Sequence, residues 1–361
     1  MLERMWKKIL RRRRLSLWGI PAFFLWLASL VYRLGYRFHR QGAADAVKVG
    51  VPVISVGNIT VGGSGKTPLV GFIAHDLLNE GIRVGVVSSA YGRQGVTEFV
   101  EPGYKVQQMA VTETGDEVKL LAMSLPEAVF SIHPTKLVAA QRLAESSLVD
   151  VMIVDDGFQH VKLARDLDIV AYDAGVKKRY LKMFPYGILR EPKHALKRAD
   201  IVIVTRAEFA RDLRGLKRQI SKLAPKAEMY HAGFGTVNII GREQTLSSKY
   251  LEDKSVFLFA GVGNFRSLRR QVSALSSDLD HALELSDHQE YDSELLAEIK
   301  RQADKHDSDL ILTTLKDWVK LGDFDFGREI YYLDLNVDLD PGEEKLLAYI
   351  CDKLKLPRRE R

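Results

Sequence analysis

The chain has 361 residues, of which 46% are hydrophobic and 28% are charged, as is typical of a folded protein with room for two domains. Its single cysteine, Cys351, excludes an internal disulfide and therefore a secreted, disulfide-stapled fold. The net charge is +6, but the first 40 residues carry ten basic side chains and one acidic one, so the other 321 residues carry a net −3. A mildly acidic body argues against a nucleic-acid partner.

The first predicted element is an apolar segment near the N-terminus. Residues 15–32 are 18 consecutive uncharged residues with basic residues on both sides. The run is slightly short for a spanning helix, which needs about 20 apolar residues, and Pro21 weakens a helix there. A cleaved signal peptide, a membrane span and a helix in the membrane interface remain open. Seven basic residues precede the run and would keep the N-terminus in the cytoplasm, so a single span would export the rest of the chain. An interfacial anchor over residues 1–40, attracted to anionic lipid, avoids this conflict and is preferred.

Beyond residue 40, short apolar runs alternate with amphipathic stretches, which predicts βαβ units in an α/β fold with a mostly parallel sheet flanked by helices. The first series has strands at 51–56, 84–88, 151–154, 169–172 and 201–204, and helices at 69–78, 117–124, 136–145 and 213–223. The second has strands at 256–260, 310–314 and 330–333, and helices at 267–275 and 293–304. We therefore expect a core domain over 41–225 and a smaller α/β domain over 226–361.

The strongest local signal follows the first predicted strand, where residues 60–67 read TVGGSGKT. Glycines in such a loop let backbone amides approach phosphate oxygens at the N-terminus of the next helix. Lys66 would contact the β- and γ-phosphates, and the Thr67 hydroxyl would bind Mg²⁺. A strict phosphate loop has glycine in place of Thr60, and a glycine-rich turn without a ligand is the alternative. The candidate nucleotide-binding residues are Thr60, Val61, Gly62, Gly63, Ser64, Gly65, Lys66 and Thr67.

A second signal lies at the end of the predicted strand 151–154, which runs into Asp155 and Asp156. A carboxylate in this place is held beside Mg²⁺ in phosphate-loop enzymes. Many strands end in aspartate at a turn, so the pair gains its meaning from the phosphate loop that precedes it. Together the two signals predict a site for ATP and Mg²⁺.

Further motifs resemble one family. SVGNITVGGSGKTP at 55–68 and DDGFQH at 155–160 are joined by ETGDE at 113–117, RDLDIVAYDA at 165–174, LREP at 189–192, SDHQEY at 286–291 and TTLKDWVKL at 313–321. This set resembles the tetraacyldisaccharide 4'-kinases of lipid A biosynthesis, from residue 15 to about 350. The resemblance implies transfer of the ATP γ-phosphate to the 4'-hydroxyl of an acylated glucosamine disaccharide 1-phosphate. It also implies a peripheral or monotopic protein of the inner membrane, with its catalytic domains in the cytoplasm and no obligate protein partner.

The resemblance implies that Asp116 is the catalytic base, that His288 is its partner, and that Lys66 acts on the transferred phosphate. A sugar hydroxyl needs a carboxylate within hydrogen-bond reach to take its proton, and a neighbouring histidine can orient that carboxylate. Without the resemblance, Asp116 would be interpreted as the N-cap of the helix that begins beside it, and His288 as an exposed loop residue.

The resemblance also implies a metal site with Asp155 and Asp156. The further active-site positions that it implies are Glu117, Gln159, Arg190 and Glu191. For Arg190 and Glu191, the alternative is an exposed ion pair of little energetic weight.

The chain departs from the family's usual residues at a few positions. Ala90 stands where an arginine is usual, and Lys136 replaces another arginine, which keeps the charge but loses bidentate phosphate recognition. Tyr186 and Leu315 are also unusual, Leu315 in the place of a glutamate. Two other functions remain as alternatives: a GTPase, because residues 314–317 faintly resemble a guanine-reading motif, and a membrane-tethered, nucleotide-driven switch for a protein partner.

Overall fold

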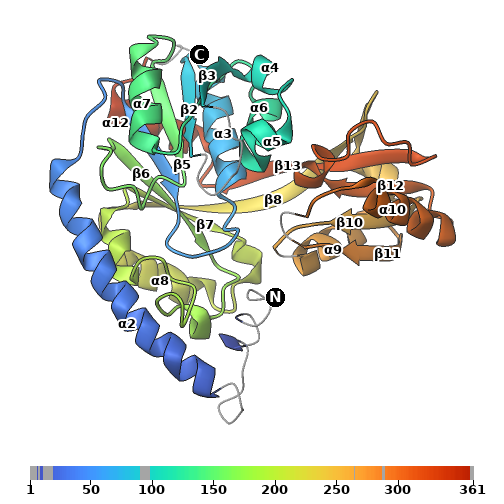
Figure 1. Cartoon of the computed structure of the whole chain (residues 1–361), viewed down its shortest axis with the longest axis horizontal. Helices are drawn as coiled ribbons and strands as arrows, with labels where there is room; N and C mark the ends of the chain where they lie inside the picture. The colour runs from blue at the N-terminus through green and yellow to red at the C-terminus, as the bar shows by residue number, and fades with distance from the viewer. Residues whose placement is uncertain are drawn as a thin grey trace.

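A computed structural model describes residues 6, 9–10, 19–89, 98–263, 265–286 and 289–357 (Figure 1). One mixed sheet runs through the described chain in the strand order β11-β10-β12-β13-β8-β7-β6-β1-β5-β2-β4-β3, with β9 paired to β8. Most neighbouring strands are parallel, and helices cover both faces. The predicted α/β fold with a mostly parallel sheet is confirmed.

The half that contains the phosphate loop has every strand and helix predicted for it, with small shifts at their ends. Its strands are β1 (Val53–Gly57), β2 (Val84–Ser88), β3 (Phe99–Pro102), β4 (Val129–Ile132), β5 (Val151–Asp155), β6 (Leu167–Asp173) and β7 (Ile201–Thr205). Its main helices are α3 (Lys66–Asn79), α6 (Asp116–Ser124), α7 (Lys136–Glu145) and α8 (Leu213–Leu223). Shorter elements are α4 (Gly103–Val106), α5 (Val111–Thr114), η2 (Lys178–Tyr180), η3 (Lys193–Arg198) and η4 (Ala207–Phe209).

The central strands are buried on both sides, because successive side chains of a strand point to opposite faces. Ile54 and Val56 of β1 pack under α3 and α6, whereas Val53 packs with α7. The parallel pairing of β1 with β5 and β6 brings the carboxyl ends of these strands to one edge of the sheet. Ligands of α/β proteins bind at this edge, so the fold brings the loops after β1 and β5 together.

The second half has the predicted strands β10 (Ser255–Ala260) and β12 (Leu310–Thr314), and β11 (Asp278–Glu284), which was not predicted. Its helices are α9 (Phe265–Ser273), α10 (Ser293–Lys305) and α11 (Leu315–Trp318), with the short elements β9 (Thr245–Ser247) and η5 (Ser248–Leu251). Parallel pairing of β10 with β11 and β12 forms this end of the sheet, which has its own apolar core.

Two long strands join the halves. β8 (Glu228–Ile240) pairs with β7 at its start and then runs antiparallel to β13 (Glu329–Asp340), so that both halves share one sheet (Figure 1). The sequence predicted only 330–333 as a strand, because the exposed and half-buried residues of this ribbon lack a continuous apolar run. The last helix, α12 (Glu343–Leu354), returns to the core under β1 and α3. The domain division at residue 225 remains a prediction.

The helix α2 (Gly19–Gln41) lies along the outside of the phosphate-loop half (Figure 1). Pro21 lies in its first described turn and does not interrupt it. Among the described residues, α2 is the one helix whose length and apolar composition would allow it to cross a membrane. Length and composition are the only basis for this statement. It leads through η1 (Gly42–Asp45) into the sheet.

Candidate active site

The phosphate loop leads from β1 into α3 through two left-handed glycines. Gly62 has φ 107°, and Gly65, the N-cap of α3, has φ 81°. A β-carbon on Gly65 would lie 2.8 Å from Cζ of Phe234. Both this steric clash and the positive φ therefore disfavour any larger residue at position 65. The helix therefore begins at Lys66, and no side chain of its N-cap residue caps it, so the backbone amides of Lys66 and Thr67 can face an anion.

Neighbouring side chains hold the loop in this shape. Asn58 Nδ2 donates to the Ser64 hydroxyl at 2.7 Å, and the Thr205 hydroxyl donates to the Ser64 carbonyl at 3.0 Å. Thr60 pairs with Leu189 in an isolated antiparallel bridge. Because this backbone is extended, the position does not need the glycine of the strict motif. The same bridge brings the LREP segment against the phosphate loop.

Asp156 is the acid that contacts the phosphate-loop lysine. Its backbone is left-handed, with φ 51°, a conformation that aspartate tolerates better than most residues. One carboxylate oxygen lies 3.5 Å from Lys66 Nζ, and the other accepts a hydrogen bond from Arg190 Nη1 at 2.6 Å. Gly57 permits the close approach of the two loops, since a β-carbon there would lie 2.5 Å from Cβ of Phe158.

The two adjacent acids differ in their pKa values. Burial raises the pKa of Asp155 to about 6, with Lys136 opposing that rise. Burial also disfavours the charged form of Asp156, but Lys66, Arg190 and Lys136 outweigh it and lower its pKa to about 2. Asp156 is therefore charged throughout the physiological range, whereas Asp155 is charged near neutral pH and takes up a proton in mildly acidic solution, which a bound cation would oppose.

Lys136 holds the turn that carries both acids. Its Nζ donates to the main-chain carbonyls of Asp155 and Asp156, each at 2.7 Å. Burial lowers its pKa, against the attraction of the two carboxylates. A compact ammonium suits this role, because it can donate to both carbonyls, and the bidentate fork of arginine is not required.

Both acids fit a divalent cation. Within the described part of the chain, Asp155 Oδ1 and Asp156 Oδ1 are buried and accept no hydrogen bond, and Lys66 Nζ lies 3.5 Å from Asp156 Oδ1. Such oxygens are unfavourable unless an ion or water completes their contacts. Among the described residues, no group of three or more His, Cys, Asp or Glu side chains could hold a metal by itself. This donor set suits Mg²⁺, which takes one or two carboxylates and completes its shell with water and substrate phosphates.

Arg190 and Glu191 do not pair with each other, so their interpretation as an exposed ion pair is wrong. Arg190 binds Asp156, whereas the Glu191 side chain is only 1% exposed and pairs with Arg198 at 2.9 Å. Gln159 lies between them: its Nε2 is 3.3 Å from Glu191 Oε1, and its Oε1 is 3.5 Å from Arg190 Nη1. The structure thus brings Gln159, Arg190 and Glu191 together beside Asp156.

Asp116 is the first residue of α6, and Gly115 is the N-cap of that helix, so Asp116 is not the cap. Its Oδ2 lies 2.7 Å from Nζ of Lys320, which reaches it from the second half of the chain. Both side chains are largely buried, at 14% and 10% exposure. His288 lies outside the described residues, and its pairing with Asp116 remains a prediction. Glu117, the next residue, is near enough to Asp155 to help raise its pKa.

Lys320 was missed by sequence reasoning, although it lies within the TTLKDWVKL motif. Its position in this motif was the only sequence feature that could have identified it, and the motif by itself indicates no chemical role for the lysine. Its Nζ is also 3.4 Å from the Gln289 carbonyl, in the segment that follows His288. An ion pair across the two halves, mostly shielded from water, is worth more than one at the surface and orients both groups.

Comparison with known proteins shows the family of the chain that carries this site. The sequence profile of the tetraacyldisaccharide-1-P 4'-kinase family, LpxK, matches residues 21–355. The chain belongs to this family. Two relatives named tetraacyldisaccharide 4'-kinase support the assignment. The protein of Geobacter metallireducens is 36% identical over 301 residues, or 81% of this chain and 86% of its own. That of Syntrophotalea carbinolica is 34% identical over 343 residues, or 93% and 94%.

A solved structure of the same family has the same fold. LpxK from Aquifex aeolicus, crystallised in complex with ATP, matches with a TM-score of 0.72 and 28% identity. The match covers 92% of this chain and 99% of that one. The likeness therefore extends over both halves of the sheet and is not limited to the phosphate-loop half.

The guanine-reading alternative fails on the geometry of Asp317. In a guanine-reading motif this carboxylate would have to be open to a base. Here one of its oxygens accepts a hydrogen bond from the Tyr291 hydroxyl at 2.8 Å. The other accepts from the Thr314 hydroxyl at 2.7 Å and from the Gly261 amide at 3.1 Å. Asp317 is 1% exposed and has a structural role in this member of the family.

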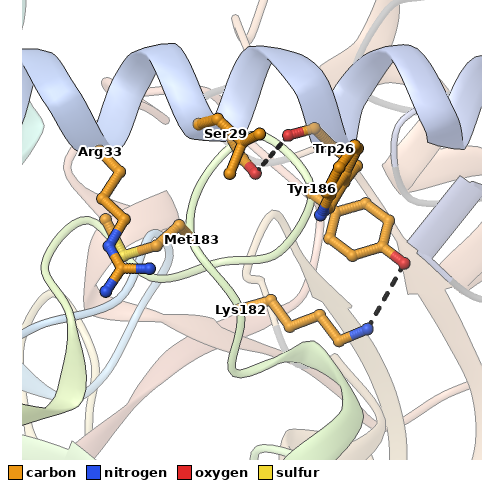
Figure 2. Close-up of a pocket in the computed structure, with 7 residues that line it drawn as sticks. Trp26, Ser29, Arg33, Lys182, Met183 and Tyr186 are labelled. Carbon is orange, nitrogen blue, oxygen red and sulfur yellow. Dashed lines mark hydrogen bonds between the residues drawn. The ribbon is translucent and has the colours of Figure 1, made fainter.

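The helix α2 lies directly against the loops of this site. His39 Nε2 is 3.3 Å from the Gln159 carbonyl, and the Tyr32 ring packs on Phe184 at 5.6 Å between centroids. A shallow groove separates α2 from the loop that leads into LREP (Figure 2). The groove is lined by Trp26, Ser29, Leu30, Arg33, Lys182, Met183 and Tyr186. Figure 2 shows two cations among them, Arg33 from α2 and Lys182 from the facing loop.

Proposed function

We propose that this chain transfers the γ-phosphate of ATP to the 4'-hydroxyl of a tetraacyldisaccharide 1-phosphate, a step of lipid A biosynthesis. One observation carries the proposal: in a member of this kinase family, the phosphate-loop Lys66 lies 3.5 Å from an acid that Arg190 also binds. Lys66 neutralises charge on the β- and γ-phosphates, and Arg190 and Lys136 add positive charge at the same place.

Asp116 is the base in this proposal. It takes the proton of the 4'-hydroxyl while that oxygen bonds to the γ-phosphorus and the bond to the ADP oxygen breaks. Lys320 lies 2.7 Å from one oxygen of this carboxylate and thereby orients it. His288 is assigned as the partner of Asp116 through the resemblance of its motif.

Mg²⁺ is the metal that fits. Asp155, Asp156 and the Thr67 hydroxyl would hold it, and the ion would neutralise charge on the phosphate oxygens of ATP. The two buried carboxylate oxygens that accept no hydrogen bond from the described residues support this assignment.

The decisive assay supplies radiolabelled ATP and the tetraacylated disaccharide 1-phosphate in detergent micelles. Transfer of label to the lipid is the expected result. Preference for GTP over ATP would instead support a GTPase. Hydrolysis that depends on an added protein and ignores the lipid would support a partner switch. We expect the kinase to need no protein partner and no nucleic acid.

We also propose that α2 attaches the kinase to the cytoplasmic face of the inner membrane as a monotopic helix. Its exposed apolar residues follow a helical stripe: Ile20, Phe24, Leu27, Val31, Leu34 and Phe38. On the opposite face, Ala22, Ser29 and Tyr36 recur every seven residues and turn toward the body. A helix docked along the body in this way has one apolar face left for lipid, which suits an interfacial position.

Replacing Phe24 and Val31 together by serine is expected to weaken membrane flotation and to raise the apparent KM for the lipid. Two exposed apolar residues are lost from the face that binds the bilayer, while the nucleotide site is unchanged. The matched control replaces Val237 and Leu148 by serine, two apolar residues that are also exposed, at 53% and 49%, but lie outside α2. Equal flotation of both double variants would show that the body, and not α2, binds the membrane.

Replacing Lys320 by methionine is expected to lower kcat by about tenfold, because the base loses the group that orients it. The loss should be smaller than that caused by removing Asp116 itself. Lys305→Met, at an exposed site in α10, is the control. Steady-state phosphoryl transfer at saturating ATP measures the effect, and an unchanged kcat would remove Lys320 from the mechanism.

A further inference from the structure

One face of α2 makes hydrogen bonds to the segment beside the phosphate loop. The Tyr32 hydroxyl donates to the Arg190 carbonyl at 3.1 Å, and the Tyr36 hydroxyl donates to Glu191 Oε2 at 2.9 Å. A helix that served only to hold the protein at a membrane would not need to reach a buried carboxylate there.

Glu191 is the junction of these contacts, and its side chain is 1% exposed. Its carboxylate accepts hydrogen bonds from Arg198 Nη2 at 2.9 and 3.1 Å, from Gln159 Nε2 at 3.3 Å, and from Tyr36. A buried carboxylate requires a paired charge and hydrogen bonds to its oxygens. Arg198 supplies the charge, and Tyr36 supplies a donor from a helix distant in sequence.

Gln159 connects this junction to the phosphate loop. Its Nε2 is shared between Glu191 and the carbonyl of Asn58, at 3.3 and 2.6 Å. Asn58 in turn donates from Nδ2 to the hydroxyl of Ser64 at 2.7 Å. A shift of Glu191 would therefore change the bonds that hold Asn58 and the loop.

Gln159 also connects the junction to the metal-binding acid. Its Oε1 is 3.5 Å from Nη1 of Arg190, and the same nitrogen is 2.6 Å from Asp156 Oδ2. The contacts run from Tyr36 through buried or half-buried polar groups to Asp156. In a low-dielectric interior, such a network stays ordered only while each member keeps its partners.

We propose that Tyr36 is a positioning residue of the kinase: by donating to Glu191, it holds Gln159 and Arg190 against the nucleotide site. The proposal rests on the proposed function. The same helix then has two tasks on two faces. Its exposed stripe binds the membrane surface, and Tyr36 completes the support of the active site when α2 is seated on the body. Catalysis is thereby coupled to a correctly docked anchor.

The test is Tyr36→Phe in the full chain, assayed with the tetraacyldisaccharide 1-phosphate in micelles. The ring and its packing remain, so only the hydroxyl is lost. We expect kcat to fall about tenfold, the effect of losing a hydrogen bond to a buried charged group, with unchanged KM for the lipid and unchanged flotation. Tyr32→Phe is the matched control, because its hydroxyl reaches an exposed backbone carbonyl that water can satisfy.

A double-mutant cycle separates positioning from a general loss of stability. If Tyr36 acts through Gln159, Tyr36→Phe should have little further effect in a Gln159→Ala background. A kcat within about twofold of wild type, or effects that multiply in the double variant, would overturn the proposal. Thermal melting of each variant shows that the fold is retained.

The wild-type chain distinguishes this proposal from the proposed function. Absence of lipid phosphorylation by the wild type would count against the kinase assignment. Slow ATP hydrolysis without acceptor is then the readout for Tyr36, because the network ends at the nucleotide site. A fall in that rate for Tyr36→Phe, and not for Tyr32→Phe, would still support the positioning role, and equal rates would refute it.

Discussion

Lys66→Ala is expected to reduce phosphoryl transfer to a few per cent of wild type or less. Lys66 begins α3 and is only 14% exposed, so its charge acts on the phosphates with little screening by water. Removing one preorganised group that stabilises charge in the transition state commonly costs about 10²–10³ in rate. Asp156 would keep Arg190 as its partner, so the fold should survive.

Transfer of radiolabelled phosphate to the lipid acceptor measures this loss, and thermal melting checks the fold. Lys105→Ala is the matched control, since Lys105 pairs with Glu101 at the surface and is 54% exposed. Surface pairs of this kind contribute little, and normal activity is expected. Substantial activity in Lys66→Ala would mean that the loop does not bind the transferred phosphate.

Asp116→Ala is expected to lower kcat by roughly 10²–10⁴, the range for a lost general base, while nucleotide affinity changes little. The structure sharpens this expectation, because Gly115, and not Asp116, is the N-cap of α6. Its carboxylate instead faces Lys320. Loss of the side chain should therefore affect the chemical step far more than the helix.

Asp212→Ala provides the opposite case within the same chain. Asp212 is a true N-cap, and its side chain accepts from the Gly215 amide at 2.8 Å at the start of α8. Its loss should cost about 1 kcal/mol of unfolding free energy and leave kcat unchanged. If Asp116→Ala behaves like Asp212→Ala, with a lower melting temperature and normal turnover, Asp116 is not the base.

The elements that sequence predicted well are those with continuous apolar runs. β2, β12, α7 and α8 have their predicted bounds, because strands buried on both faces and amphipathic helices leave clear patterns. β8 was missed because most of its residues are exposed or half-buried. β13 was shortened to its continuous buried run at 330–333, because beyond this run buried and exposed residues alternate. No local pattern predicts that such a ribbon joins two halves into one sheet.

The candidate site shows the same division. The glycines, Lys66 and the acid pair could be predicted because the chemistry of phosphate binding is local to one loop and one strand end. The side chains that contact Asp116 and Glu191 could not be predicted in this way. Lys320 and Tyr36 lie far from Asp116 and Glu191 in the sequence, and a lysine or a tyrosine has no pattern that identifies its partner.

The amino-acid sequence by itself determined the reaction class, the nucleotide loop and the presence of an apolar, basic N-terminal segment, because each depends on residues that are neighbours in the chain. Only the tertiary structure decided how these parts act together. It placed Asp116 against Lys320 and Arg190 against Asp156, and it docked α2 on the Glu191 segment. These contacts arise where the sheet edge, the second half and the helix meet, and such meetings follow from packing of the whole chain rather than from any local pattern.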